Sequence, residues 1–330
     1  MSQQPVEQGR IPTLHVVADS IPQAHFRAMK AVWEQGLAIR TEYDRRDSAG
    51  DYIDPPSRDA RVLIEVKDPF ADPRYPPLSF CEIGTYIAEI MGVKDHYVVP
   101  MDKLKDAVTG EFAALEWPYT YHQRLFAHPA VDGSIVNQME LAVDRIAHTP
   151  YSRRAMATTA VPNIDVYLKE DVPCLREVQL RCPEDADGNY VLNMNTMWRS
   201  RDLYKAWPDN VIAITFMQSV LAAQIAEKAG RATRVGSYAD YSFAMHIYGQ
   251  DFGAVGGDPE RGLQSLFDTF DEETYVARSL TGDQAKEMLV LPQLKGLLTG
   301  RQVEQWKFPP ESVAILEDLA AGIESGKYRP

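Results

Sequence analysis

The chain has 330 residues, of which 45% are hydrophobic and 25% are charged, a composition typical of folded globular proteins. Its net charge of −13 argues against a general nucleic-acid binder, because such proteins need a basic surface. Three cysteines, Cys81, Cys174 and Cys182, are too few for a disulfide scaffold and favour a reducing compartment. Their spacing offers no zinc site, so no metal is expected.

The sequence also argues against a membrane protein. No run of about 18 apolar residues is present, as a membrane-spanning helix would need. The polar stretch 1–10 lacks the apolar core of a secretory signal. We therefore expect a cytoplasmic protein that binds neither membrane nor nucleic acid.

In the first half of the chain, helical spacing of apolar residues predicts helices over 21–40, 79–91 and 134–148. In the second of these, Ser79 is the expected N-cap and Glu82 stands at the capping-box spacing. The apolar run 62–66 predicts a strand. The residues before it, 41–60, are polar and predict a loop.

In the second half, Gly188-Asn189 predicts a hairpin turn between strands over 178–182 and 190–194. The strongly apolar stretch 211–230 predicts a central buried helix. A further strand is expected over 235–248, and amphipathic helices over 259–285 and 310–325. The whole pattern predicts an α+β fold, with a large, mainly antiparallel sheet and helices packed against it.

Cys174 is the candidate nucleophile. A catalytic thiol needs a lowered pKa, which nearby cations provide. The arginines nearest to it in sequence are Arg153, Arg154, Arg176 and Arg199. The alternative interpretation is a small buried hydrophobic side chain, and Cys81 and Cys182 fit that one better.

Two basic pairs have the donors that hold a phosphate. Arg153-Arg154 follow a helix-ending Pro-x-Ser, and Arg199-Ser200 stand at the end of a predicted strand. Planar guanidinium groups bind phosphate oxygens bidentately, and the serine hydroxyl adds a donor. Either pair alone is equally compatible with a solvated surface.

Further polar residues fit the binding of a nucleotide. His246 and Tyr248 alternate along a predicted strand, so they share one face and are able to hold a sugar hydroxyl, unless they only line the core edge. Asp209 and Asn210 precede the apolar helix, where one would cap it or read a pyrimidine edge. Glu82 stands at an apolar helix start, where burial would suit it to proton transfer if it is not a capping residue.

Taken in order, these motifs resemble the thymidylate synthase superfamily. The clear resemblance covers about 120–250 and, more faintly, 58–92. The motifs that carry it are P-Y-S-R-R at 150–154, V-P-C at 172–174, Gln179, R-S-R-D at 199–202, P-D-N at 208–210 and H-I-Y at 246–248. The resemblance implies one thymidylate-synthase-like domain over 1–330, with a divergent C-terminal region and a homodimer formed through one face of the sheet.

The resemblance also implies catalytic roles. Cys174 would add to carbon 6 of a pyrimidine nucleotide. Glu82, in C-E-I-G, would be the catalytic glutamate, with Glu89 as the alternative. Tyr121 would lie near the reacting carbon. Methylenetetrahydrofolate would be the one-carbon donor, with Asp202 contacting its pterin.

Phosphate binding would fall to Arg199 and Ser200, helped by Arg153 and Arg154 from the partner subunit, with Arg58 as an additional ligand.

The sugar would be held by His246 and Tyr248. Asn210 would read the base edge, with Asp209 and Gln179 as further base-binding residues. An Asn amide suits uracil, whereas a carboxyl such as that of Asp209 suits cytosine. The base, and ribose against deoxyribose, stay open at this point.

Several positions depart from the methylating synthases. Leu175 stands where they usually have His, and Trp198 where they have Gln. Phe243-Ala244 replace a Gly-Asp pair, and G-K-Y-R-P replaces a short apolar terminus that closes over folate. The C-E-I-G-x-Y-I form is similar to the deoxycytidylate hydroxymethylases.

The resemblance therefore favours 5-hydroxymethylation of CMP or dCMP, as in pathways to nucleoside antibiotics. The alternatives are a UMP or dUMP hydroxymethylase, a thymidylate synthase-type methylase, and a nucleotide-binding regulatory homologue without activity.

Overall fold

The structure is a computed structural model that describes residues 9–78, 82–100, 116–130, 132–166, 168, 172–254, 261–299 and 307–330. The chain folds into two compact units, each built from three separate segments. Unit 1 comprises Met1–Phe80, Trp198–Val211 and Ala239–Thr281. Unit 2 comprises Cys81–Met197, Ile212–Tyr238 and Gly282–Pro330.

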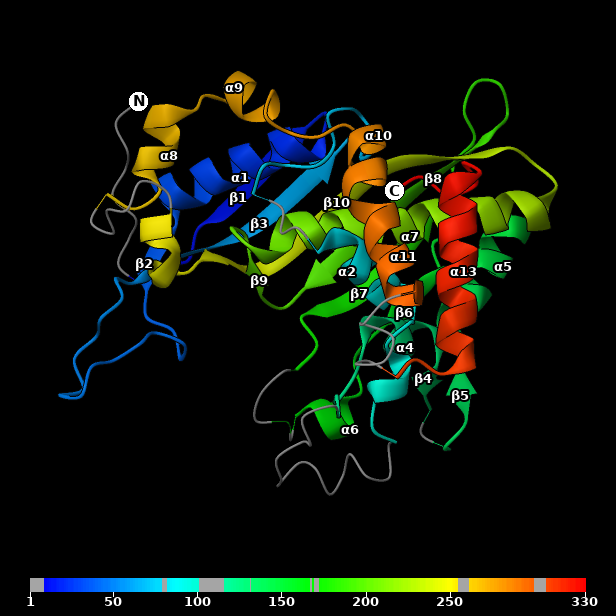
Figure 1. Cartoon of the computed structure of the whole chain (residues 1–330), viewed down its shortest axis with the longest axis horizontal. Helices are drawn as coiled ribbons and strands as arrows, with labels where there is room; N and C mark the ends of the chain where they lie inside the picture. The colour runs from blue at the N-terminus through cyan, green and yellow to red at the C-terminus, as the bar shows by residue number, and fades with distance from the viewer. Residues whose placement is uncertain are drawn as a thin grey trace. The chain divides into compact units, whose positions relative to one another are not determined.

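Most of the strands join one eight-stranded sheet, in the order β1-β3-β10-β8-β7-β6, with β2 beside β3 and β9 beside β10 (Figure 1). Its strands are β1 (Thr13–Ala18), β2 (Leu37–Ile39), β3 (Ser57–Val66), β6 (Met156–Thr158), β7 (Leu175–Arg181), β8 (Tyr190–Trp198), β9 (Arg201–Asp202) and β10 (Thr233–Ile247). Pairing is parallel for β1 with β3 and for β9 with β10, and antiparallel for β2 with β3 and for β6 with β7. A large mixed sheet with helices confirms the predicted α+β class.

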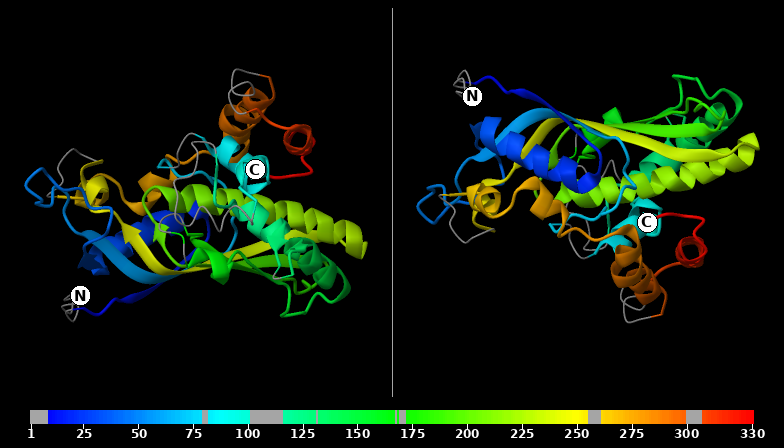
Figure 2. Two further views of the ribbon diagram at one scale, coloured as in Figure 1. Left: turned by 90° about the horizontal axis from the view of Figure 1, so that it is seen from below. Right: turned by 90° about the horizontal axis from the view of Figure 1, so that it is seen from above.

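In unit 1, helix α1 (Ile21–Gln35) packs along β1 and β3 (Figure 2). Its buried face includes Phe26, Met29 and Val32, as helical spacing predicts. The predicted end at residue 40 is wrong, because Gly36 turns the backbone extended and the next residues form β2. The predicted loop 41–60 is likewise too long, since β3 begins at Ser57. The remaining helices of unit 1 are η2 (Gly249–Ala254), α8 (Gln264–Thr269) and α9 (Glu272–Val276).

In unit 2, helix α2 (Ile83–Ile90) begins later than predicted. Glu82 is therefore the N-cap residue itself, with no side-chain capping bond, and the capping-box interpretation is wrong. Ser79, its expected N-cap, lies outside the described residues. Helix α5 (Gln138–His148) also starts late, because Asn137 caps it and the two preceding residues form β5.

The following further elements of unit 2 lie in the part of the chain that the structure describes. They are η1 (Asp95–Tyr97), α4 (Tyr121–Phe126), β4 (His128–Pro129), β5 (Ile135–Val136), α6 (Pro162–Asp165), α10 (Gly282–Ala285), the π-helical η3 (Lys286–Val290), α11 (Leu291–Thr299) and α13 (Pro310–Glu324). The predicted helical stretch 259–285 is thus broken into short helices. The predicted helix 310–325 is confirmed as α13.

The hairpin turn predicted at Gly188-Asn189 is confirmed, because it lies in the connection 182–189 that joins the neighbouring strands β7 and β8. Gly188 has a positive φ of 78°, and an antiparallel bridge between Glu184 and Tyr190 closes the turn. The side chain of Asp185 accepts a hydrogen bond from the backbone N–H of Asn189, at 2.9 Å, and so stabilises this loop.

The central apolar helix is α7 (Ala206–Ala229). It begins five residues earlier than predicted, so Asp209 and Asn210 lie in its first turns and neither is the N-cap. The negative charge of Asp209 in the first turn is stabilised by the positive end of the helix dipole. By length and composition alone α7 is apolar enough to cross a membrane, but 78% of its apolar stretch is buried within the protein, as in a core helix.

Candidate active site

Cys174 lies in unit 2, directly before β7, and is half-buried. Its two neighbours are fixed by hydrogen bonds. The hydroxyl of Thr159 donates to the carbonyl of Leu175, and Nη1 of Arg176 donates to the carbonyl of Pro173 at 3.3 Å. The thiol is therefore presented from a rigid stretch of backbone.

The cation nearest to Cys174 in sequence is already compensated. Arg176 lies 3.3 Å from Asp165, whose other oxygen lies 3.2 Å from the buried guanidinium of Arg124. The same carboxylate accepts the backbone N–H of Val161 at 2.9 Å. Arg176 thus holds the segment before β7 in place, so its charge is not reserved for the thiol.

Gln179 lies further along β7. Its amide donates to the carbonyl of Arg153 at 3.3 Å and accepts from Asn195 at 3.3 Å. Arg153 and Arg154 themselves are exposed just before β6. Their binding of a phosphate in a neighbouring subunit stays a prediction.

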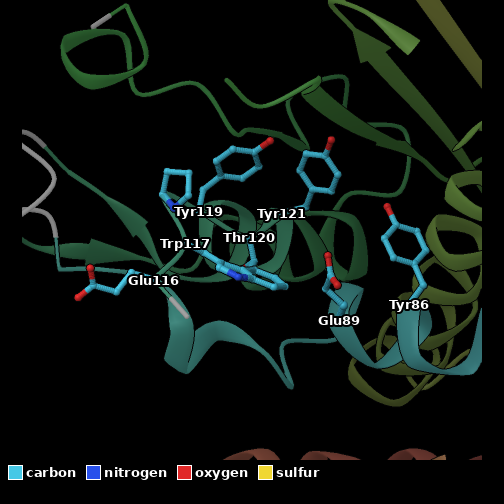
Figure 3. Close-up of a pocket in the computed structure, with 8 residues that line it drawn as sticks. Tyr86, Glu89, Glu116, Trp117, Tyr119, Thr120 and Tyr121 are labelled. Carbon is cyan, nitrogen blue, oxygen red and sulfur yellow. The ribbon is translucent and has the colours of Figure 1, made fainter. Parts of the chain in front are cut away.

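A cavity of about 490 Å³ lies in unit 2 beside Tyr121, the first residue of α4. Tyr86 and Glu89 of α2 line it together with the residues 116–121 (Figure 3). The Glu89 carboxylate is ion-paired with Lys94 at 2.9 Å. The cavity therefore combines tyrosine hydroxyls, a carboxylate and aromatic walls.

Glu82 does not line this cavity. It is exposed at the start of α2, whereas Glu89, seven residues further along, reaches the same cavity as Tyr121. Of the two glutamates considered from the sequence, Glu89 is thus the one that the structure brings together with the predicted catalytic tyrosine.

Unit 1 carries Arg199, Ser200 and Asp202 in and around β9. Arg199 is exposed and Ser200 is half-buried. One carboxylate oxygen of Asp202 accepts the backbone N–H groups of Tyr204 and Lys205, at 2.9 and 3.0 Å. Burial nevertheless raises the pKa of Asp202 to about 6.

Arg201 and Asp240 form a buried ion pair at 3.0 Å in unit 1. Trp207 donates its indole N–H to the same carboxylate oxygen at 3.0 Å, and Nε of Arg201 donates to Oδ1 of Asn210 at 3.3 Å. The predicted base reader is thus tied to a charge pair that sequence reasoning missed. The basic third position of R-S-R-D was the available signal, but nothing marked Asp240 as its partner.

The rings of His246 and Tyr248 lie 4.3 Å apart in unit 1, consistent with their alternation along the chain. His246 is buried, and its Nε2 has no hydrogen-bond partner among the described residues. A buried polar atom of this kind indicates a missing partner such as a water or a ligand hydroxyl. Arg58 of β3 lies over the ring of Trp33 and donates to the carbonyl of Gly36 at 3.4 Å.

The predicted site residues are therefore distributed over both units. Unit 1 contributes Arg58, Arg199, Ser200, Asp202, Asp209, Asn210, His246 and Tyr248, and unit 2 contributes Glu82, Tyr121, Arg153, Arg154, Cys174 and Gln179. Within the described ranges, no group of three or more His, Cys, Asp or Glu side chains is arranged to hold a metal ion.

Comparison with known proteins identifies a matching family. The family model described as thymidylate synthase matches residues 95–265, more than half of the chain. The chain belongs to the thymidylate synthase family. Membership makes it a one-carbon transferase of that kind, and the family uses methylenetetrahydrofolate.

Individual relatives of this thymidylate synthase family member come from archaea. A protein of Methanosarcina acetivorans named "Putative thymidylate synthase" is 27% identical over 76% of this chain and 94% of its own length. One of the same name from Methanocaldococcus jannaschii is 35% identical over 39% of this chain and 55% of its own length. A solved structure, thermostable thymidylate synthase A from Bacillus subtilis, covers 70% of this chain and 81% of its own, with 18% identity and a TM-score of 0.47.

Two buried imidazoles should resist protonation. Burial lowers the pKa of both His246 and His25 from the ordinary 6.5 to about 4. Between pH 6.5 and 4 these two imidazoles are protonated in the unfolded chain but stay neutral in the folded protein. Their contribution to the free energy of unfolding therefore falls as the pH falls. Titration of the ring C2 protons by NMR should give midpoints near 4, with each signal assigned by its loss in His246→Asn or His25→Asn. A midpoint near 6.5 for either ring would contradict its burial.

Proposed function

We propose that the protein is a pyrimidine nucleotide 5-hydroxymethylase that acts on CMP or dCMP with methylenetetrahydrofolate as the one-carbon donor. The observation that carries this proposal is the polar cavity beside Tyr121. Tyrosine hydroxyls and the Glu89 carboxylate border it, and such groups supply the several hydrogen bonds that an ordered water needs. A hydroxymethylase must admit a water that a methylating synthase excludes.

Two buried side chains support the same branch. Leu175 and Trp198 stand where the methylating synthases have polar residues, and both are almost completely buried. Leu175 thus has no polar group to offer beside Cys174, and Trp198 lacks the hydrogen-bond acceptor that Gln has.

The C-terminal segment is also held in place. The ring of Tyr328 is buried against Gly322 of α13, and its hydroxyl donates to Asp318 at 3.0 Å. The backbone N–H of Tyr328 donates to the carbonyl of Gly322 at 2.9 Å. In this conformation these residues are packed on α13, so they do not act as a closing segment over a folate.

The chemistry begins at Cys174. Its thiolate adds to carbon 6 of the pyrimidine, and the electron pair of the ring double bond makes carbon 5 nucleophilic. Methylenetetrahydrofolate, when bound, supplies a one-carbon unit to carbon 5, and its pterin would be held by Asp202. Loss of the carbon 5 proton to a glutamate, Glu82 or Glu89, would break the bond between the one-carbon unit and the folate nitrogen, so that tetrahydrofolate would leave and an exocyclic methylene would remain on carbon 5. Addition of water to this methylene and expulsion of Cys174 complete 5-hydroxymethylation.

The remaining residues would bind the nucleotide. Arg199 and Ser200 would hold the phosphate, with Arg58 as an additional ligand, and Arg153 and Arg154 would be donated by the partner subunit of a homodimer.

His246 and Tyr248 would hold the sugar. Nε2 of His246 has no hydrogen-bond partner among the described residues, so this neutral imidazole suits a sugar hydroxyl. Asn210 would read the base, with Asp209 and Gln179 beside it. We place the enzyme in the cytoplasm, and a pathway to a nucleoside antibiotic is one that would use its product.

A methylating synthase is the second candidate, because the relative from Methanosarcina acetivorans is named "Putative thymidylate synthase" and is matched over 94% of its length. The two candidates share every step up to the exocyclic methylene. They differ in what attacks it, which is water in one and hydride from the folate in the other.

Tritium release from 5-tritiated nucleotides tests the proposed function. With methylenetetrahydrofolate, the wild type should release tritium from CMP or dCMP faster than from UMP or dUMP, because carbon 5 loses its proton in the proposed reaction. Cys174→Ser should lower release by at least about 1,000-fold while nucleotide binding persists. Release from none of the four nucleotides would refute the enzyme, and release by Cys174→Ser would remove the thiol from the mechanism.

Substituting each glutamate in turn tests which one transfers the proton. Glu89→Gln should lower kcat for tritium release by about 100-fold or more with little change in nucleotide affinity, because Glu89 shares the cavity with Tyr121. Glu82→Gln is the matched variant on the same helix. A large loss of kcat in Glu82→Gln alone would instead assign the role to Glu82 and leave Glu89 as the partner of Lys94.

A further inference from the structure

The pair of Arg201 and Asp240 is fully enclosed in the interior of unit 1. Their side chains are 1% and 0% exposed, and Nη1 lies 3.0 Å from Oδ2. The guanidinium also lies 3.7 Å from the centre of the Trp198 ring, and the indole N–H of Trp207 donates to the same carboxylate oxygen. Contacts on several sides leave the arginine fork little freedom to move.

The fork holds one further group, the side-chain amide of Asn210. Nε of Arg201 lies 3.3 Å from Oδ1. A guanidinium has five donors and no acceptor, so the amide atom that faces it must be the oxygen. The NH₂ end of the amide is therefore the end turned away from Arg201.

This orientation matters because Asn210 is the proposed base reader, so the inference rests on the proposed function. Cytosine has an acceptor at ring nitrogen 3, whereas uracil has an N–H donor there. An amide that presents its NH₂ group pairs with the cytosine nitrogen and opposes the uracil N–H. To accept from uracil, the amide would have to turn its oxygen away from a buried guanidinium and leave that donor unpaired.

We propose that Arg201, held by Asp240, is a specificity-determining positioning residue. It binds the amide oxygen of Asn210, so that the amide offers a donor to the base and selects cytosine nucleotides over uracil nucleotides. Asn210, which without this contact suits uracil, becomes a reader of cytosine, and the carboxyl of Asp209 is not needed for that purpose.

The test is the ratio of dissociation constants for UMP and CMP, measured by calorimetry without folate. The wild type should prefer CMP by at least about tenfold. In Arg201→Lys the charge of Asp240 keeps a partner, but a single ammonium replaces the fork that reaches both Asp240 and Asn210. The preference should then fall at least about fivefold, through tighter binding of UMP as well as weaker binding of CMP.

A second variant keeps the test possible if Arg201→Lys does not fold. Arg201→Met combined with Asp240→Leu removes both charges together, so no unpaired charge stays buried. This double variant should melt cooperatively and show the same loss of preference. Arg74→Lys is the control, because Arg74 is another buried arginine of unit 1, and its Nε donates to the carbonyl of Pro69, away from Asn210. It should keep the wild-type ratio even if it lowers the melting temperature.

Three outcomes would overturn the inference. They are a wild type without preference for CMP, a folded Arg201 variant that keeps the wild-type ratio, and a control that loses it equally. The readout is binding, so it is separate from the identity of the product. An enzyme that binds CMP selectively through Arg201 but methylates it would refute the proposed hydroxymethylation and leave this inference standing.

Discussion

Arg201 and Asp240 compensate each other's charge in the interior of unit 1. Removing a charge from water costs several kcal/mol even after relaxation, and only a close, well-bonded partner offsets that cost. Arg201 belongs to β9, Asp240 to β10, and Trp207, which bonds to the same carboxylate, to α7. The need to neutralise one buried charge therefore fixes the chain near Asn210, which lies in the first turns of α7.

Unit 2 has a similar cluster of buried charges near Cys174, the proposed nucleophile. Asp165 is almost completely buried and lies between Arg124 and Arg176, and Arg176 also holds the carbonyl of Pro173, next to Cys174. In each unit a buried carboxylate thus holds an arginine that contacts a proposed site residue or its neighbour. Both proposed site residues lie near the ends of strands, where a rigid scaffold supports accessible side chains.

The sequence predicts what depends on local pattern and misses what depends on distant partners. The spacing of apolar residues was enough for the α+β class and for the cores of α1, α7 and α13. The predicted end of α1 and the predicted start of α5 were wrong. Gly36 and Asn137 set these helix ends through local contacts, which compete with the spacing of apolar residues. The ordered motifs around Cys174 were enough to predict the family, which the family model confirms. The partner of Arg201 could not be predicted, because 39 residues separate it from Asp240 and a single Asp in a strand carries no mark of its partner.

The central claim is that water, and not hydride, reaches the exocyclic methylene. The most direct measurement is mass spectrometry of the nucleotide formed from CMP and methylenetetrahydrofolate in ¹⁸O-labelled water. We expect 5-hydroxymethyl-CMP with one solvent oxygen in its new hydroxyl group, and the folate should be released as tetrahydrofolate. A product that carries a methyl group without solvent oxygen, together with dihydrofolate, would contradict it.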